Sequence, residues 1–111
     1  MSLPPIVLNE AEHRFEMHVD GHMASEVFEC FPGGINYLHT IVPEALSGRG
    51  IASAIAKHVL DYAAEHQLKV IPTCPYIRAY IEKHPQYQPL VLAAPFLWID
   101  TSFHPPRCGK N

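Results

Sequence analysis

The sequence lacks any segment long and apolar enough to cross a membrane. Its longest apolar run, Leu90 to Ile99, is far shorter than the roughly 20 residues that a spanning helix needs, and it contains Pro95. The first residues, Met1 to Pro5, lack the charged and apolar regions of a signal peptide. There is no basic stripe, and the net charge is −3 with neutral histidines. We therefore expect no membrane partner and no nucleic-acid partner, and a cytoplasmic location.

Cysteine is scarce and the usual metal-binding and nucleotide-binding spacings are missing. The three cysteines, Cys30, Cys74 and Cys108, are odd in number and far apart, which argues against a disulfide framework and favours a reducing compartment. No Cys-x-x-Cys pair and no His-x-x-x-His pair on a credible helix is present, so we expect no metal site. Neither a Gly-x-Ser-x-Gly motif nor a Walker-type lysine motif occurs.

The 111 residues that are present fit one domain with one core, and its first half reads as extended segments. The expected strands cover residues 6–8, 14–19, 23–31 and 35–42. Asp20-Gly21 is a two-residue turn signal between the second and third of them. The tightest register for this hairpin sets Phe15 opposite Glu26, an awkward pair, so the hairpin is better defined than its register.

A glycine-containing turn between a strand and a helix is the stretch around which the chain is organised. Gly48 and Gly50 stand just ahead of a helical pattern that continues to about His66. Without a Cβ, the two glycines let several backbone N–H groups point at one spot. These groups are the unpaired donors of the first helical turn, and the helix dipole adds positive charge there. The pattern predicts an anion cradle, most often for phosphate, with a plain tight turn as the alternative.

After this helix, residues 68–73 predict a strand parallel to the strand that precedes the turn. Pro72 cannot donate a ladder hydrogen bond, so the two strands should separate there and leave a wedge for a ligand. Pro75 fits the first position of a second helix, which makes Cys74 its N-cap, and Pro85 should end that helix. Residues 87–92 are expected to form a last strand.

Three side chains are candidates for chemistry. Cys74 lies at a helix N-terminus, which favours the thiolate and lowers a cysteine pKa; the alternative is a small buried residue that packs the strand end. His39, on the strand before the turn, is a candidate base, and the alternative is a sheet-face histidine whose nitrogens are satisfied. His84 is expected at the C-terminal end of the second helix, with ligand contact as the alternative.

Two groups of residues resemble one branch of the GNAT acetyltransferases, the very small single-domain N-acetyltransferases. The first group runs from His39-Thr40 through Val42-Pro43-Glu44 to Gly48-Arg49-Gly50-Ile51-Ala52, and the second is Thr73-Cys74-Pro75-Tyr76-Ile77 followed by Tyr80-Ile81 and His84-Pro85. The likeness covers about residues 5 to 91. It implies an α/β (α+β) fold with a splayed, mixed but mostly antiparallel sheet and two main helices. Residues 1–92 would form this domain and residues 93–111 a C-terminal extension.

The resemblance also implies a set of site residues. It places the acyl-CoA pyrophosphate on N–H groups of the glycine turn and the family's proposed catalytic cysteine on Cys74. The implied cofactor-binding residues are Val42, Ser47, Gly48, Arg49, Gly50, Ile51, Ala52 and His84, and the catalytic candidates are Cys74 and His39. Two positions depart from the family. Ser47 replaces the usual Arg or Gln, for which Arg49 is a candidate substitute, and Ile41 stands where many relatives carry Glu.

The implied function is transfer of an acetyl group from acetyl-CoA to an unidentified primary amine, on a small molecule or a protein. Either the amine attacks the thioester directly, or Cys74 takes the acetyl group first. The alternative is a module that binds CoA or acyl-CoA without turnover. The missing Glu at position 41 favours the module, and the retained Cys74 favours the enzyme. A monomer and a homodimer both stay open, and the tail from Pro95 is expected to pack Phe96 or Trp98 on its own domain or a partner subunit.

Overall fold

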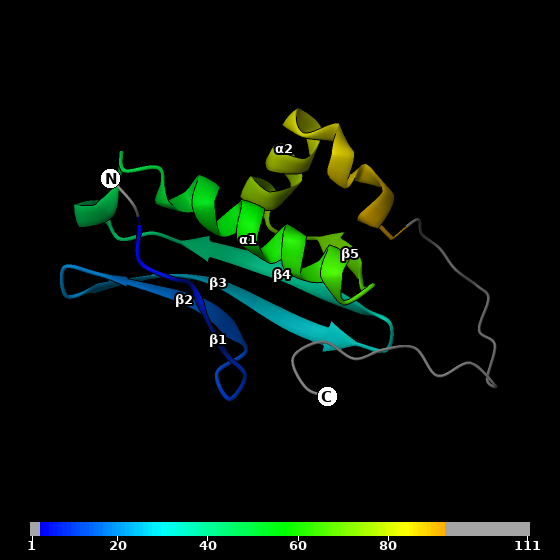
Figure 1. Ribbon diagram of the computed structural model, residues 1–111, viewed down its shortest axis with the longest axis horizontal. Helices are drawn as coiled ribbons and strands as arrows, with labels where there is room; N and C mark the ends of the chain where they lie inside the picture. Colours follow the sequence, from blue (N-terminus) through cyan, green and yellow to red (C-terminus); the bar gives the residue numbers. More distant parts are fainter. Residues whose placement is uncertain (1–2, 93–111) are drawn as a thin grey trace.

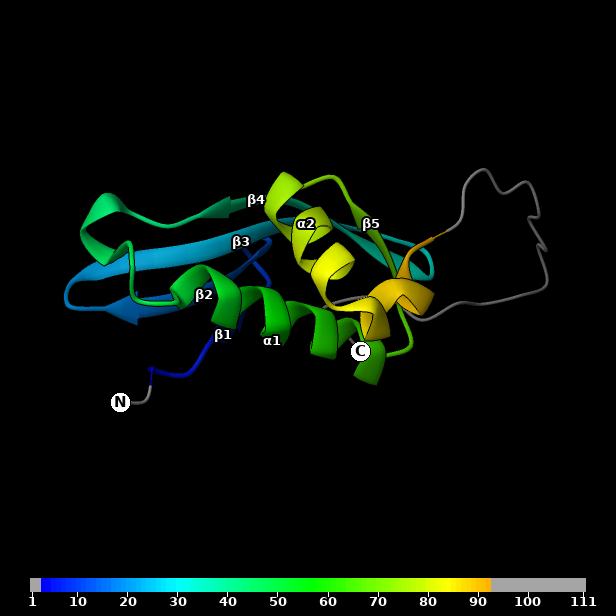
Figure 2. The ribbon, with the colours of Figure 1, turned by 90° about the horizontal axis from the view of Figure 1, so that it is seen from above.

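The computed structural model describes residues 3–92. Within them, one sheet carries its strands in chain order, and two α-helices pack on one of its faces (Figures 1 and 2). The elements are β1 (Val7–Asn9), β2 (Arg14–Val19), β3 (His22–Phe31), β4 (Gly34–Ile41), the 3₁₀ helix η1 (Glu44–Leu46), α1 (Ile51–Glu65), β5 (Lys69–Pro72), α2 (Pro75–Lys83) and the 3₁₀ helix η2 (Pro85–Leu90). β1 to β4 pair antiparallel, and β4 and β5 pair parallel. This mixed sheet with two main helices confirms the expected fold class.

The core fills the space between the inner face of the sheet and the two helices. Ile51, Ile55 and Val59 recur at helical spacing and are buried on the side of α1 that faces the sheet. The Tyr37 hydroxyl on β4 donates a 2.6 Å hydrogen bond to the Val59 carbonyl, so its burial leaves no unsatisfied polar group. The sheet adds the apolar side chains of Phe15, Met17, Ala24, Phe28 and Ile35.

The hairpin between β2 and β3 adopts its tightest register, the one that sets an apolar residue opposite a glutamate. Asp20 and Gly21 both have positive φ in the two-residue turn, and Phe15 lies directly opposite Glu26. Partners that face each other across an antiparallel pair project to the same side of the sheet. Glu26 is therefore placed on the inner face, among the core residues.

A β-bulge interrupts the pairing of β3 with β4. Val27 pairs with His39, but Phe28 pairs with Tyr37, so Leu38 is an extra residue on β4. Side chains alternate along a strand, and one extra residue reverses the alternation. As a consequence Thr40, rather than His39, shares the inner face with Glu26.

The parallel pair of β4 and β5 ends where the sequence predicts it. The ladder runs from Gly34 opposite Lys69 to Tyr37 opposite Pro72, and the Cys74 amide then donates a 2.8 Å hydrogen bond to the Tyr37 carbonyl. Beyond this point β4 continues to Ile41 with no partner strand on this side among residues 3–92. The separation at Pro72 is confirmed, and we call the region between this end of β4 and the start of α2 the splay.

The expected last strand over residues 87–92 is wrong. The chain forms η2 instead, with 3₁₀ bonds from the Tyr87 amide to the His84 carbonyl and from the Val91 amide to the Gln88 carbonyl. Pro85 and Pro89 explain the difference, since proline fixes φ near helical values and has no amide for a sheet ladder. Only a single parallel bridge between Val70 and Val91 remains of the expected strand.

The cysteines differ in their bonding. Cys74 is free, whereas Cys30 is disulfide-bonded. The argument for reduced cysteines therefore does not hold at Cys30.

Among residues 3–92, no helix combines the length and apolar character needed to cross a membrane. The expected packing of Phe96 or Trp98 concerns residues outside the described part of the chain.

Candidate functional site

The glycine turn connects η1 to α1 and has the backbone geometry that its sequence predicts. Gly48 and Gly50 have φ values of +82° and +75°, in the left-handed region that favours glycine. Gly50 is the N-cap of α1 and makes no side-chain cap. In the described part of the chain, Ala54 is the first residue of this helix whose amide has an acceptor, the Gly50 carbonyl at 3.1 Å. Within residues 3–92, the amides of residues 48–53 have no backbone acceptor and are available as donors.

The space in front of these donors is open. An added Cβ at Gly48 or Gly50 would meet nothing within 4 Å, and the turn itself is exposed. The two polar side chains of the turn are engaged elsewhere. Arg49 forms a 2.8 Å ion pair with Asp20, and the Ser47 hydroxyl donates to the Glu44 carbonyl at 3.0 Å. The turn therefore offers backbone amides, and the guanidinium of Arg49, the candidate substitute for the missing Arg or Gln, is paired with Asp20. These open donors fit a phosphate-bearing ligand.

Cys74 lies at the splay, as the N-cap of α2 that the sequence predicts. Its thiol makes no capping bond to the helix and is nearly fully buried, with 1% of the residue exposed. The sulfur lies 3.1 Å from the Thr40 hydroxyl oxygen, on the part of β4 beyond the parallel ladder. Pro72 and Pro75 together set this position, because the first ends the strand pairing and the second starts the helix.

Glu26 completes a buried polar chain behind Cys74. The Thr40 hydroxyl donates a hydrogen bond to Glu26 Oε1, while Glu26 Oε2 is buried with no hydrogen-bond partner among residues 3–92. Burial raises the pKa of Glu26 from 4.5 to about 8, and the hydrogen bond from Thr40, with the Cys74 thiol beyond it, opposes that rise. The site therefore holds a carboxyl that is mostly protonated at neutral pH and can take up a proton once ionised.

Sequence reasoning missed Glu26 and Thr40 as site residues. Two signals for them existed, namely the awkward pairing of Phe15 with Glu26 and a carboxyl at an inward position of an apolar strand. A carboxylate is almost never buried without a purpose or a partner. Thr40 gave no such signal, since only the bulge at Leu38 turns it toward Glu26.

The other predicted residues lie at varied distances from this cluster. His39 is exposed and, by register, projects from the opposite face of the sheet, so the structure does not bring it together with Cys74. His84 lies at the C-terminal end of α2, where its ring stacks on Tyr80 with centroids 4.0 Å apart and its Nδ1 lies 2.9 Å from the Tyr80 carbonyl oxygen. Val42 follows β4 directly and packs against the core. Ile41, at the position of the family's Glu, is half exposed.

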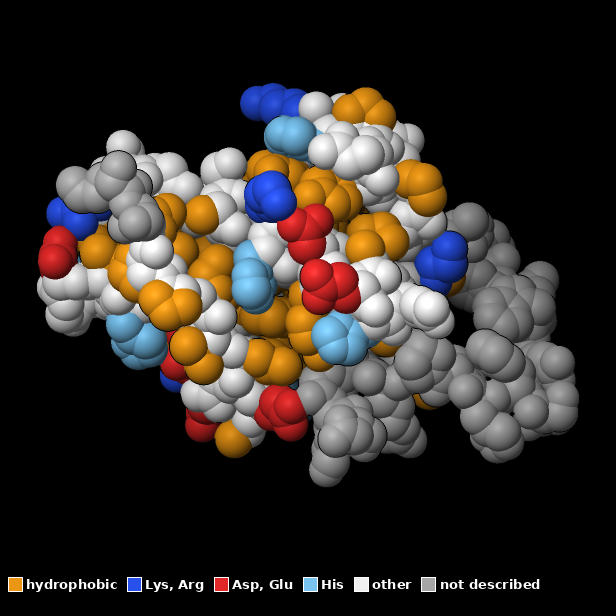
Figure 3. Space-filling model, in the orientation of Figure 1, with side chains coloured by type: hydrophobic (Ala, Val, Ile, Leu, Met, Phe, Trp, Pro, Cys, Tyr) orange, Lys and Arg blue, Asp and Glu red, His pale blue; other side chains and the backbone are white. Residues whose placement is uncertain are grey.

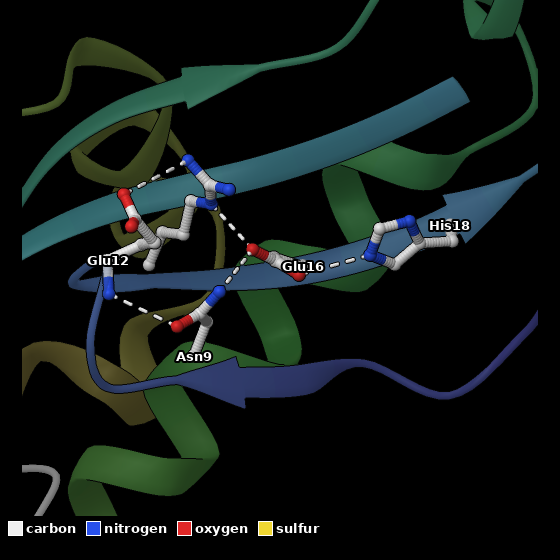
Figure 4. Close-up of polar contacts among 5 residues, drawn as sticks. Asn9, Glu12, Glu16 and His18 are labelled. Atoms are coloured by element: carbon white, nitrogen blue, oxygen red, sulfur yellow. Dashed lines mark hydrogen bonds and ion pairs between the residues drawn. The ribbon is translucent and has the colours of Figure 1, made fainter. Parts of the chain in front are cut away.

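A second carboxyl cluster lies on the opposite face of the sheet (Figure 4). Glu16 accepts hydrogen bonds from Arg14 Nε at 2.6 Å and Asn9 Nδ2 at 2.8 Å, and its other oxygen lies 3.0 Å from His18 Nε2. Hydrogen bonds from Arg14, His18 and Asn9 lower the pKa of Glu16 to about 2. Both oxygens are occupied, so this cluster ties β1 to β2 and leaves nothing for a ligand.

Charged groups are dispersed over the face that carries the helices. In Figure 3 the Lys and Arg side chains are scattered among acidic, histidine and apolar ones. On α1, Lys57 and Asp61 form a 2.8 Å ion pair, and the Tyr87 hydroxyl of η2 donates to Asp61 at 2.7 Å. These contacts fasten η2 to α1.

Comparisons with known proteins agree with this arrangement. Residues 14–90 match the family described as GCN5-related N-acetyl-transferase. Human protein NATD1 is 45% identical over 51 residues, and zebrafish (Danio rerio) protein NATD1 is 42% identical over 60 residues. These matches cover 46% and 52% of this chain, and 45% and 54% of the two relatives, so the chain spans about half the length of the curated relatives it matches.

A solved structure extends the likeness over most of the chain. The NMR solution structure of a GCN5-like protein from Staphylococcus aureus superposes with a TM-score of 0.64 at 29% sequence identity. The alignment covers 86% of this chain and 94% of that protein. With the match over residues 14–90, this shows that the chain belongs to the GCN5-related N-acetyltransferase family.

Proposed function

We propose that this protein is an acetyl-CoA-dependent N-acetyltransferase that acts on a primary amine. The observation that carries the proposal is the arrangement at the end of β4. After β4 the chain passes through η1 to the glycine turn, where the amides of residues 48–53 are available. The splay, which holds Cys74, lies beside the same end of β4. An anion site and a buried thiol cluster at one edge suit a ligand that has a phosphate at one end and a thioester at the other.

The residues of the turn fit the phosphate end of such a donor. The amides of Gly48 to Ala52 would hold the pyrophosphate, and the helix dipole of α1 would add to the attraction. Val42, at the end of β4, would line the path of the pantetheine. The bound donor supplies an activated acetyl group. The protein orients that group, excludes water and manages the protons of the transfer.

Two routes lead from the thioester to the amide product. In the direct route the amine loses a proton and attacks the thioester carbonyl. In the covalent route Cys74 takes the acetyl group first and passes it to the amine. In this route the burial of Cys74 requires that the thioester carbon reach into the cluster at the splay. The alternative function is a module that binds acyl-CoA without turnover.

We also propose that residues 1–92 constitute the acetyltransferase domain and residues 93–111 a C-terminal extension. The family match ends at residue 90, which supports a boundary near this position. Acceptors of this scaffold vary widely, so the fold alone does not choose among amines.

Binding of CoA by calorimetry tests the donor site. Gly50→Val should weaken binding at least tenfold, because a branched side chain would stand in the open space before the amides. Gly21→Val is the matched control, since Gly21 also has positive φ and open space around its Cβ position but lies in the β2–β3 turn. A folded Gly50→Val protein that binds CoA as tightly as the Gly21→Val protein would show that the donor lies elsewhere.

Release of free CoA thiol separates the enzyme from the binding module. Acetyl-CoA is incubated with the wild-type protein and a panel of primary amines, which includes polyamines, lysine-containing peptides and free peptide N-termini. Amine-dependent thiol release with formation of an N-acetyl product is the expected result. Tight CoA binding with no thiol release across the panel would support the module.

A further inference from the structure

We propose that Glu26 and Thr40 form a proton relay that deprotonates the Cys74 thiol as it accepts an acetyl group. This inference rests on the proposed function, since it assigns roles within the covalent route. It adds two residues that lie on different strands and outside the glycine turn. The relay runs from Cys74 Sγ to Thr40 Oγ1 and on to Glu26 Oε1.

The direction of the relay follows from the hydrogen count. A threonine hydroxyl carries one proton, and that of Thr40 is donated to Glu26 Oε1. The 3.1 Å contact between Thr40 Oγ1 and Cys74 Sγ therefore has the thiol as its donor. When Glu26 is ionised, each proton points toward the carboxylate, so transfer along the chain needs no side-chain rotation.

The surroundings of Glu26 mark it as more than a structural residue. Glu26 is fully buried at 0% exposure, and its Oε2 has no partner. A buried carboxyl with a free oxygen destabilises the fold, and a well-packed apolar residue would avoid that penalty. A buried carboxyl of this kind is typical of a functional site, particularly where it lies beside a buried nucleophile. The unused Oε2 leaves room for a second hydrogen bond during the reaction.

No cation competes for the Glu26 carboxyl in the described residues. From β2 the facing residue is Phe15, and from β4 the Tyr37 hydroxyl is already bonded to Val59 on α1. Burial raises the pKa of Tyr37, so this phenol stays protonated. His58 of α1 packs its ring against Phe15, and burial lowers its pKa, which keeps it neutral near pH 7. Glu26 therefore shares its proton with the Cys74–Thr40 chain alone.

The acylation step balances as follows. A bond forms between Cys74 Sγ and the thioester carbonyl carbon, and the bond from that carbon to the donor sulfur breaks. The thiol proton moves to Thr40 Oγ1 as the Thr40 proton moves to Glu26 Oε1. The electron pair of the broken bond leaves on the donor sulfur, which solvent then protonates. The products are acetyl-Cys74, protonated Glu26 and free donor thiol.

Single-turnover acetylation of Cys74 by acetyl-CoA, followed by intact mass and peptide mapping between pH 6 and pH 9, tests the relay. The wild-type rate should rise with pH and level off above about pH 8, as Glu26 ionises. Glu26→Gln should remove this inflection and slow acetylation about 100-fold, as loss of a general base does. Thr40→Val should act similarly, and Thr40→Ser should stay within a few-fold of wild type. Glu29→Gln, an identical change at an exposed position of β3, is the matched control.

Alkylation by iodoacetamide over the same pH range separates failure of the relay from failure of the donor site. If iodoacetamide reactivity depends on Glu26 and Thr40 while acetyl-CoA does not react, the relay stands and the proposed donor is wrong. If Glu26→Gln matches Glu29→Gln with both reagents, the relay is overturned. A Cys74 that reacts with neither reagent overturns it as well.

Discussion

Glu16 and Glu26 occupy adjacent strands of one sheet and differ in almost everything except residue type. Glu16 lies on the face away from the helices, and both of its oxygens have partners on β1 or β2. Glu26 lies on the core face, and one of its oxygens has none. Their pKa values are displaced in opposite directions, to about 2 and about 8. A carboxyl whose two oxygens are both hydrogen-bonded stabilises the sheet, whereas a carboxyl with one free oxygen can still accept a hydrogen bond or a proton during a reaction.

The same contrast separates the two histidine candidates from Cys74. His84 is engaged with Tyr80, and His39 is exposed on the opposite side of the sheet from the buried cluster. Cys74 and Thr40 instead lead to a carboxyl with a vacant oxygen. Within residues 3–92, the splay holds a buried carboxyl oxygen without a partner and the glycine turn holds the first amides of α1, and these two features are the physical basis for proposing function there.

The largest effect expected from this comparison is on stability as pH rises. Glu26 has a folded pKa of about 8 against 4.5 unfolded, so the unfolded chain ionises first. Wild-type stability should therefore fall between pH 4.5 and pH 8 and level off above that range. At about 1.4 kcal/mol per pKa unit, the total loss should be about 5 kcal/mol. Urea unfolding of the wild type and Glu26→Gln across this range measures the effect as a difference. A difference that does not change with pH would mean that Glu26 is not a buried acid.

A smaller effect of opposite sign is expected at Glu16. Its folded pKa of about 2 lies below 4.5, so its contribution is present above pH 4.5 and is lost as pH falls toward 2. Glu16→Gln should destabilise the protein by about 1–2 kcal/mol at pH 7, less than the full pKa displacement because solvent screens the Arg14 pair. The variant should equal the wild type near pH 2. If Glu16→Gln and the wild type were equally stable at pH 7, the Glu16 cluster would not stabilise the sheet.

Much of the fold could be predicted because its signals are local. Alternation located β2, the Asp20-Gly21 turn located the hairpin, and Pro72 with Pro75 located the splay and the N-cap at Cys74. The glycine turn likewise needs only residues that are close in sequence. Each of these features depends on backbone preferences that a short stretch carries by itself.

The rest depended on contacts between distant segments. The bulge at Leu38 arises from the pairing of β3 with β4, and without it alternation along β4 would place His39 rather than Thr40 on the inner face. The burial of Glu26 depends on the hairpin register and on α1 and α2 covering the sheet. The prolines of η2 overrode a strand pattern over residues 87–92. Local sequence patterns therefore could not predict the buried relay, although they did predict the glycine turn and the position of Cys74.

The central claim is that an inner carboxyl stands ready to take a proton beside Cys74, and ¹³C NMR titration of the glutamate carboxyls tests it most directly. One titration reports on Glu16 and Glu26 together, assigned with the Glu16→Gln and Glu26→Gln variants. The account predicts midpoints near pH 2 for Glu16 and near pH 8 for Glu26. It also predicts that the Glu26 midpoint moves up in Cys74→Ala, since the thiol no longer supports the Thr40 hydrogen bond that favours the carboxylate. A Glu26 that titrates near 4.5 with the exposed glutamates, unmoved by Cys74→Ala, would contradict it.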